Sequence, residues 1–71
     1  MYQVTLCTCP TMTIAQDIAQ QLVTEKLAAC INIVPNITSV YRWQDNVVSE
    51  TEVQLLIKSK LEYFALLNDR I

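Results

Sequence analysis

Apolar and polar side chains alternate near the N-terminus, and further along the chain the pattern changes to a helical spacing. Residues 2–9, YQVTLCTC, are rich in β-branched and aromatic residues, and Tyr2, Val4 and Leu6 fall on one face of an extended chain. Pro10 follows and should end the strand, because proline lacks the N–H that a sheet requires. This segment is therefore predicted to be the first β-strand.

The next segment has the spacing of an amphipathic helix. Thr13 followed by Gln16 is a capping-box pattern, which predicts that the helix starts at Thr13. Apolar positions recur every three or four residues to about residue 28, and polar residues occupy the opposite side. The main residues of the apolar stripe are Ile14, Ile18, Leu22 and Leu27.

Two further extended segments are predicted to form a hairpin. Residues 29–43 are interpreted as one long strand, bent or bulged at Pro35, because the gap between its apolar halves is too short for a crossover. Residues 44–46 (QDN) have turn chemistry, since Asp and Asn tolerate positive φ and the chain contains no Gly. Residues 47–58 return as the partner strand.

A second helix is predicted after the hairpin. Ser59 followed by Glu62 is another capping-box pattern. The order β-α-β-β-α is a ferredoxin-like split βαβ unit without its final strand. We therefore predict an α+β fold, an antiparallel sheet with both helices on one face. The inward side of the second helix is predicted to carry Leu61, Phe64, Leu67 and Ile71.

The composition predicts one domain that associates with other chains. With 71 residues there is room for a single domain over 1–71. A chain of this size buries only about 60% of its unfolded surface. Yet 52% of the residues are hydrophobic, more than the ~45–50% of typical soluble domains. Apolar surface that one small core cannot bury is usually covered by a partner chain, so we expect an oligomer.

Charge and cysteine content exclude several classes of partner. The net charge of −2 does not give the basic surface that nucleic-acid binding requires. No apolar run approaches the ~18 residues of a membrane span. Three cysteines without a secretion signal indicate reduced thiols, and we expect a cytoplasmic protein. We expect no nucleic-acid or membrane partner.

The absence of histidine argues against an enzyme. Ser–His and Cys–His nucleophile pairs are impossible without it, and so are the common histidine-rich zinc sites. The chain also offers no obvious general base with a suitable pKa. We therefore expect no catalytic residues and no enzymatic turnover.

Cys7 and Cys9 raise the question of a soft-metal site. Residues i and i+2 of a regular strand are ~6.5–7 Å apart, whereas two thiolates sharing a metal at ~2.3 Å hold their sulfurs about 4 Å apart. The spacing is too wide unless the chain bends at Pro10. A soft ion such as Cu(I) could instead recruit Cys30 or a symmetry-related thiol. The alternative is that all three cysteines are small buried hydrophobes.

Two other groups of side chains surround the predicted hairpin turn. Glu50 and Glu52 share a strand face, which suits either a weak hard-cation site or a solvated surface. Ile37, Tyr41 and Trp43 lie on one face near the tip. These three are interpreted as core or interface anchors, with ligand stacking as the alternative.

Several motifs together resemble the CutA divalent-cation tolerance family. The resemblance covers nearly the whole chain. It rests on the segments LCTCPT, EKLAAC, VPNITSVYRW and ETEVQLLIK. It implies a ferredoxin-like subunit in a homotrimer shaped like the PII signalling proteins, with the long strand and its hairpin partner at the subunit contacts. Typical members continue beyond residue 71 with a last strand and a C-terminal helix, so the domain is expected to be incomplete at its C-terminus.

The resemblance also implies a function and a metal site. Family members are associated with tolerance of copper and other divalent metals, and some bind copper. Cys7 and Cys30 match positions where bacterial members often carry cysteine, whereas Cys9 commonly has a different small residue there. We therefore expect no obligatory cofactor and metal binding at Cys7 and Cys30, with Cys9, Glu50 and Glu52 as weaker ligands. The alternatives are a PII-like sensor of a small ligand and a structural trimeric scaffold.

Overall fold

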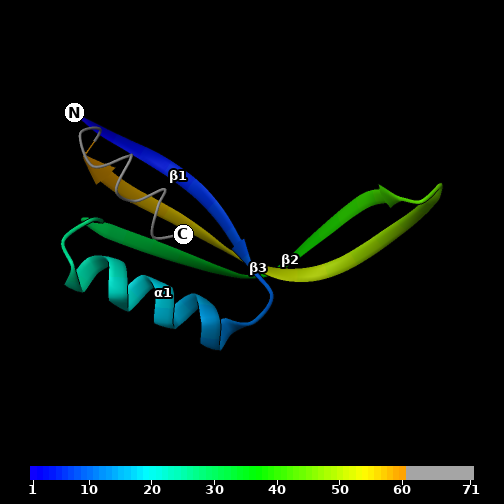
Figure 1. The fold of residues 1–71 in the computed structure, drawn as a ribbon, viewed down its shortest axis with the longest axis horizontal. Coiled ribbons are helices and arrows are strands. Elements are labelled where there is room, and N and C mark those ends of the chain that lie inside the picture. Colours follow the sequence, from blue (N-terminus) through cyan, green and yellow to red (C-terminus); the bar gives the residue numbers. More distant parts are fainter. Residues whose placement is uncertain (61–71) are drawn as a thin grey trace.

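The structure is a computed structural model that describes residues 1–60. These form β1 (Tyr2–Cys9), α1 (Met12–Thr24), β2 (Cys30–Trp43) and β3 (Asn46–Lys60), as Figure 1 shows. The predicted order β-α-β-β is confirmed over this part of the chain. The predicted inward residues of the second helix, from Leu61 onward, lie outside the described residues.

The three strands form one antiparallel sheet in the order β1-β3-β2. β3 is central: Val53 pairs with Cys9 of β1, and Ile57 pairs with Ile31 of β2. The α+β class and the antiparallel sheet are therefore confirmed. No helix within residues 1–60 is long and apolar enough to cross a membrane.

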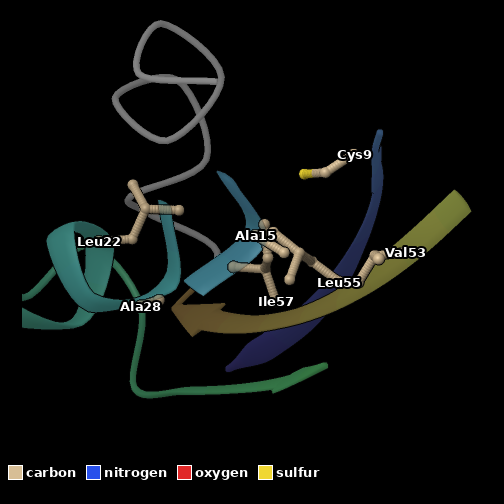
Figure 2. Close-up of a cluster of buried hydrophobic side chains, with 7 residues drawn as sticks. All are labelled: Cys9, Ala15, Leu22, Ala28, Val53, Leu55 and Ile57. Atoms are coloured by element: carbon tan, nitrogen blue, oxygen red, sulfur yellow. The ribbon is translucent and has the colours of Figure 1, made fainter. Parts of the chain in front are cut away.

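α1 covers one face of the sheet, and the core lies between them (Figures 1 and 2). The buried positions of β3 alternate along the strand, as expected for a strand with only one covered face. Ile18, Leu27, Ile31 and Ile33 pack around the edge of this core. The buried apolar residues are Cys9, Ala15, Leu22, Ala28, Val53, Leu55 and Ile57.

The opposite face of the sheet is apolar and open. Tyr2, Val4 and Leu6 share that face, as predicted, and their side chains are 62%, 55% and 62% exposed. Leu6 pairs directly with Leu56, which continues the apolar surface onto β3. No described element packs over these side chains.

The predicted irregularity at Pro35 is confirmed as a β-bulge. The register between β2 and β3 shifts between Val34 and Ile37, and Asn36 adopts a φ of 60°. β1 ends at Cys9, so beyond the bulge β2 and β3 continue alone as a two-stranded hairpin arm, residues 37–52 (Figure 1). An inserted residue bends and twists a strand in this way.

The arm closes in a tight turn at residues 44 and 45. Gln44 has a φ of 49° and Asp45 a φ of 67°, the positive values that a two-residue type I′ loop requires. Asn46, which was placed in the turn, is instead the first residue of β3 and pairs with Trp43. The turn is therefore one residue shorter than predicted.

The predicted start of α1 at Thr13 is wrong: the helix begins one residue earlier, at Met12, and its cap lies two residues before Thr13. The N-cap is Thr11, whose Oγ1 accepts a hydrogen bond from the backbone N–H of Ile14 at 3.2 Å. Thr11 has an extended backbone, which places its hydroxyl over the first turn. Two threonines two residues apart offer alternative caps, and the extended backbone of Thr11 selects the earlier one.

The helix also ends earlier than the apolar stripe suggested. It stops at Thr24, and Lys26 adopts a left-handed φ of 62°. The N–H groups of Lys26 and Leu27 donate to the carbonyls of Val23 and Leu22, both at 3.0 Å. This is a Schellman motif, which satisfies the last carbonyls of a helix. Leu27 thus packs on the core from the cap rather than from the helix.

The prediction that Ser59 caps a second helix is wrong. Ser59 lies within β3, pairs with Gln3 of β1 and is fully buried. The strand continues to Lys60, two residues beyond its predicted end. A serine followed three residues later by a glutamate fits a capping box. It fits equally well a strand in which the alternation of side chains buries the serine, and the sequence does not distinguish the two.

Replacing Lys26 with glycine should stabilise the domain. The left-handed conformation costs a non-glycine residue ~1–2 kcal/mol, and the freedom of Gly in the unfolded chain offsets ~0.4–1 kcal/mol of that gain. We expect Lys26→Gly to raise the free energy of unfolding by roughly 0.5–1 kcal/mol in urea denaturation. Lys26→Ala is the control, because it removes the charge but keeps the Cβ. Equal stabilisation by both variants would contradict the explanation.

Candidate functional site

Cys7 and Cys9 lie on the face of the sheet that α1 covers. Cys7 pairs with Leu55 and Cys9 with Val53, both of which point into the core. Cys9 is only 3% exposed, and Cys7 is half-buried against the same cluster. Figure 2 shows the Cys9 side chain on the same side of the sheet as Ala15 of α1. Both residues therefore contribute to packing, whatever else they do.

The two thiols influence each other. Burial raises the pKa of the Cys9 thiol, and the charge of Cys7 and a hydrogen bond with Cys7 raise that pKa further. Cys7 Sγ also lies 3.8 Å from the backbone oxygen of Thr8, to which it donates a weak hydrogen bond. The raised pKa keeps Cys9 protonated at neutral pH, so it is a poor free nucleophile. A soft metal ion would have to displace the proton.

Cys30 lies elsewhere. It pairs with Lys58, and Lys58 pairs with Val4, so Cys30 belongs to the open face of the sheet. Its side chain is exposed. Cys7 and Cys30, the pair first expected to bind metal, therefore lie on opposite faces of the same sheet. Within one chain Cys7 shares a face of the sheet with Cys9 and not with Cys30.

The two predicted carboxylates lie on the hairpin arm. Glu50 pairs with Ser39 and Glu52 with Ile37, on the face opposite α1. Glu50 accepts a hydrogen bond from the hydroxyl of Tyr41 at 2.7 Å. Within residues 1–60, no three His, Cys, Asp or Glu side chains are grouped to hold a metal ion. One carboxylate is thus already engaged by a neighbouring side chain.

The contact between Tyr41 and Glu50 was missed by the sequence analysis. Tyr41 pairs with Val48, and Glu50 lies diagonally across the strands, a position that the register of the arm decides. This hydrogen bond is the main reason that the pKa of Tyr41 is raised. Partial loss of water and the negative charges of Glu50 and Glu52 contribute further.

The predicted anchor residues lie on the arm as expected. Ile37, Tyr41 and Trp43 share one face, since each pairs with an even-numbered residue of β3. Ile37 is half-buried, whereas Tyr41 and Trp43 are 40% and 61% exposed. Within residues 1–60 they do not belong to the buried core, so interface contact and ligand stacking stay predictions.

A shallow cavity of about 260 Å³ lies where β1 leaves the sheet. Beyond the pairing of Cys9 with Val53, the adjacent edge of β3 has no strand partner in the described part of the chain. The cavity therefore joins the end of β1 to the start of the arm. Its lining consists of Thr8, Cys9, Pro10, Glu50, Thr51 and Glu52.

The described part of the chain defines a class of protein. It is an α+β unit with one helix on an antiparallel sheet, two cysteines on the face beneath the helix and a long hairpin arm. Residues 3–71 match the family model described as CutA1 divalent ion tolerance protein. The chain belongs to this CutA1 family, and the resemblance inferred from the motifs is confirmed.

Individual relatives agree with this assignment. The chain is 48% identical over 71 residues to the divalent-cation tolerance protein CutA of Thermus thermophilus, covering 100% of this chain and 69% of that protein. The solved structure of the Thermus thermophilus protein superposes with a TM-score of 0.90, covering 99% of this chain and 68% of the other. The chain is also 53% identical over 53 residues to a Xenopus laevis CutA homolog, covering 75% of this chain and 35% of the homolog.

Another solved structure is similar over nearly the whole chain. The periplasmic divalent cation tolerance protein CutA from Archaeoglobus fulgidus is 36% identical, with a TM-score of 0.90, covering 99% of this chain and 68% of the other. The chain thus spans about two thirds of the Thermus thermophilus and Archaeoglobus fulgidus proteins and about a third of the Xenopus laevis homolog.

The negative charge of Glu50 should control the titration of Tyr41. Because the folded-state pKa of Tyr41 is raised, the stabilisation from its hydrogen bond is present at neutral pH and is lost as the pH rises through that value. We expect Glu50→Gln to lower the pKa of Tyr41 towards its ordinary value, measured by tyrosinate absorbance against pH. In a Tyr41→Phe background the substitution should leave the titration curve unchanged. Superimposable curves for the original protein and Glu50→Gln would show that Glu50 does not act on Tyr41.

Proposed function

We propose that the protein containing this chain contributes to tolerance of divalent metal ions, copper among them, by binding the metal without enzymatic turnover. The observation that carries the proposal is the family match over residues 3–71. Its support comes from relatives named for divalent-cation tolerance, one of which is 48% identical to this chain over all 71 residues. These 71 residues contain no histidine, so the Ser–His and Cys–His nucleophile pairs cannot form among them.

We also propose that the protein acts as a homotrimer. The open face of the sheet carries Tyr2, Val4 and Leu6, a larger exposed apolar group than a small monomeric domain usually shows. On the hairpin arm, Tyr41 and Trp43 lie on the continuation of the same face. Ile37 completes the row at the base of the arm. Burying this surface between three copies would remove it from water.

The proposed location is the cytoplasm. Three free cysteines support it, since thiols stay reduced there, and residues 1–60 contain no disulfide. The Archaeoglobus fulgidus relative is named as periplasmic, so fractionation of the native protein is the direct measurement of location.

The functional proposal is tested in cells. A strain that lacks the gene should stop growing at a lower concentration of copper or another divalent ion than its parent, and the gene should restore growth. Equilibrium dialysis of the purified protein against each divalent ion should then show binding. If growth does not change and no divalent ion binds more tightly than micromolar, the metal role is wrong. Ligand sensing or scaffolding would then be favoured.

The oligomer is tested with a charge placed on the open face. Leu6 is 62% exposed and lies between the side chains of its neighbours on β1 and β3. We expect light scattering to give the mass of three chains for the original protein, and a smaller mass for Leu6→Lys because burying an unpaired charge costs several kcal/mol. Gln20→Lys, on the exposed side of α1, is the matched control and should stay trimeric. A trimer that tolerates Leu6→Lys would mean that another surface forms the contact.

A further inference from the structure

One buried position of the sheet is polar. On the face that α1 covers, the inward positions of β3 are apolar from Val53 to Ile57, and the next inward position is Ser59. The Ser59 side chain is fully buried. Its register partner on β1 is Gln3, at the point where β1 begins and β3 ends (Figure 1). On this face the strand pair therefore places a hydroxyl directly opposite a side-chain amide.

Neither polar group has a partner in the described part of the chain. The Oγ of Ser59 and the Nε2 of Gln3 are both buried, and neither makes a hydrogen bond within residues 1–60. The large majority of buried polar side-chain atoms in folded proteins are paired, either with protein atoms or with ordered water. An unpaired group loses its contacts with solvent and gains nothing in return. Two such groups in opposite positions point to one shared partner.

We propose that Gln3 and Ser59 hold one buried water molecule between them, in an internal binding site of the β1–β3 pair. The Nε2 of Gln3 donates a hydrogen bond to the water, and the water donates one to the Oγ of Ser59. The site lies beneath α1, at the opposite end of β1 from Cys9. It does not depend on the proposed metal-binding function.

The spacing of the two strands suits a single water. Residues in directly opposite positions of an antiparallel pair have Cβ atoms about 4.5–5.5 Å apart. Two hydrogen bonds of ~2.8 Å that meet at one water oxygen join atoms about 4.6 Å apart. A water molecule both accepts and donates, so it satisfies an amide N–H and a hydroxyl oxygen at the same time. Side chains that do not bond each other directly are thus bridged.

A third polar group lies on the same face. Buried waters typically make about three hydrogen bonds. Thr5 is the next residue of β1 on this face, and it pairs with Ile57, so it lies diagonally across from Ser59. Its side chain is half-buried. The Thr5 hydroxyl is therefore the nearest candidate on β1 for the third contact to the water.

The site is close to solvent, because it lies at an edge of the sheet. β1 is the outer strand of the order β1-β3-β2. Gln3 is half-buried as a residue, although its Nε2 is buried. The Gln3 side chain therefore extends inward from the surface. A water exchanges past it without opening the core beneath α1.

The shared water also distinguishes the observed register from a slip by two residues. Such a slip keeps every side chain on its own face, so the alternation of apolar residues opposes it less than it opposes a slip by one. If Gln3 moved opposite Ile57, its amide and the Ser59 hydroxyl would no longer share a partner. Both groups would then be buried and unpaired. The polar pair thus favours the register in which the two residues face each other.

The direct test is a crystal structure of the full-length protein at a resolution that shows ordered water. We expect one density peak in each chain within ~2.7–3.2 Å of both the Gln3 Nε2 and the Ser59 Oγ. This measurement needs no variant. A direct hydrogen bond between the two side chains, or a protein atom in the place of the water, would overturn the proposal.

A second test asks whether the two side chains share a partner in solution. Guanidinium unfolding is measured at one fixed chain concentration. We expect Gln3→Leu to raise the unfolding equilibrium constant by about tenfold, because it leaves the Ser59 hydroxyl buried and unpaired. In a Ser59→Ala background the same substitution should change the constant by less than about threefold, since no hydroxyl remains.

The matched control is the same substitution on the exposed side of α1. Gln20→Leu should have the same effect with and without Ser59→Ala, because Gln20 lies away from the sheet. An equal effect of Gln3→Leu in both backgrounds would show that Gln3 and Ser59 share nothing, and the site would be wrong.

Discussion

The pairing of β3 with both of its neighbours is the interaction on which the other features depend. Val53, Leu55 and Ile57 alternate along β3 and are buried beneath α1, so a slip of one residue would expose all three. Because exposing these three apolar side chains to water is unfavourable, the register of β1 on one side of β3 and of β2 on the other is fixed. The positions of the cysteines and the direction of the hairpin arm follow from that register.

The bulge at residues 35 and 36 then decides which face the arm presents. Before it, the odd-numbered residues of β2, such as Ile33, point to α1. After it, the odd-numbered residues pair with even-numbered residues of β3 and point the other way. Tyr41 and Trp43 therefore join the open apolar face instead of continuing the core side. One inserted residue thus creates a long apolar surface from an alternation that would otherwise be split between two faces.

The elements of the fold were predictable because their signals are local or strongly periodic. The strand before Pro10, the bulge at Pro35 and the turn after Trp43 each depend on a few neighbouring residues. The ends of the elements were less predictable. Thr11 and Thr13 are equivalent caps in sequence, and only the backbone angles of the folded chain select Thr11. Lys26, just after the helix, adopts the left-handed conformation in which glycine is usual. The residue type at this position therefore did not indicate the end of the helix.

The candidate site was less predictable still, because it depends on pairing across strands. Nothing in the spacing of 23 residues between Cys7 and Cys30 reveals that they lie on opposite faces. That follows only when Cys7 is aligned with Leu55 and Cys30 with Lys58, three residues apart on β3. An odd separation on the shared strand puts the two thiols on opposite sides, whatever the length of the connecting helix. The pair Cys7 and Cys9, separated by two, must share a face. The register of the central strand therefore separates Cys7 from Cys30 within one chain, and a contact between these two thiols would require a second chain.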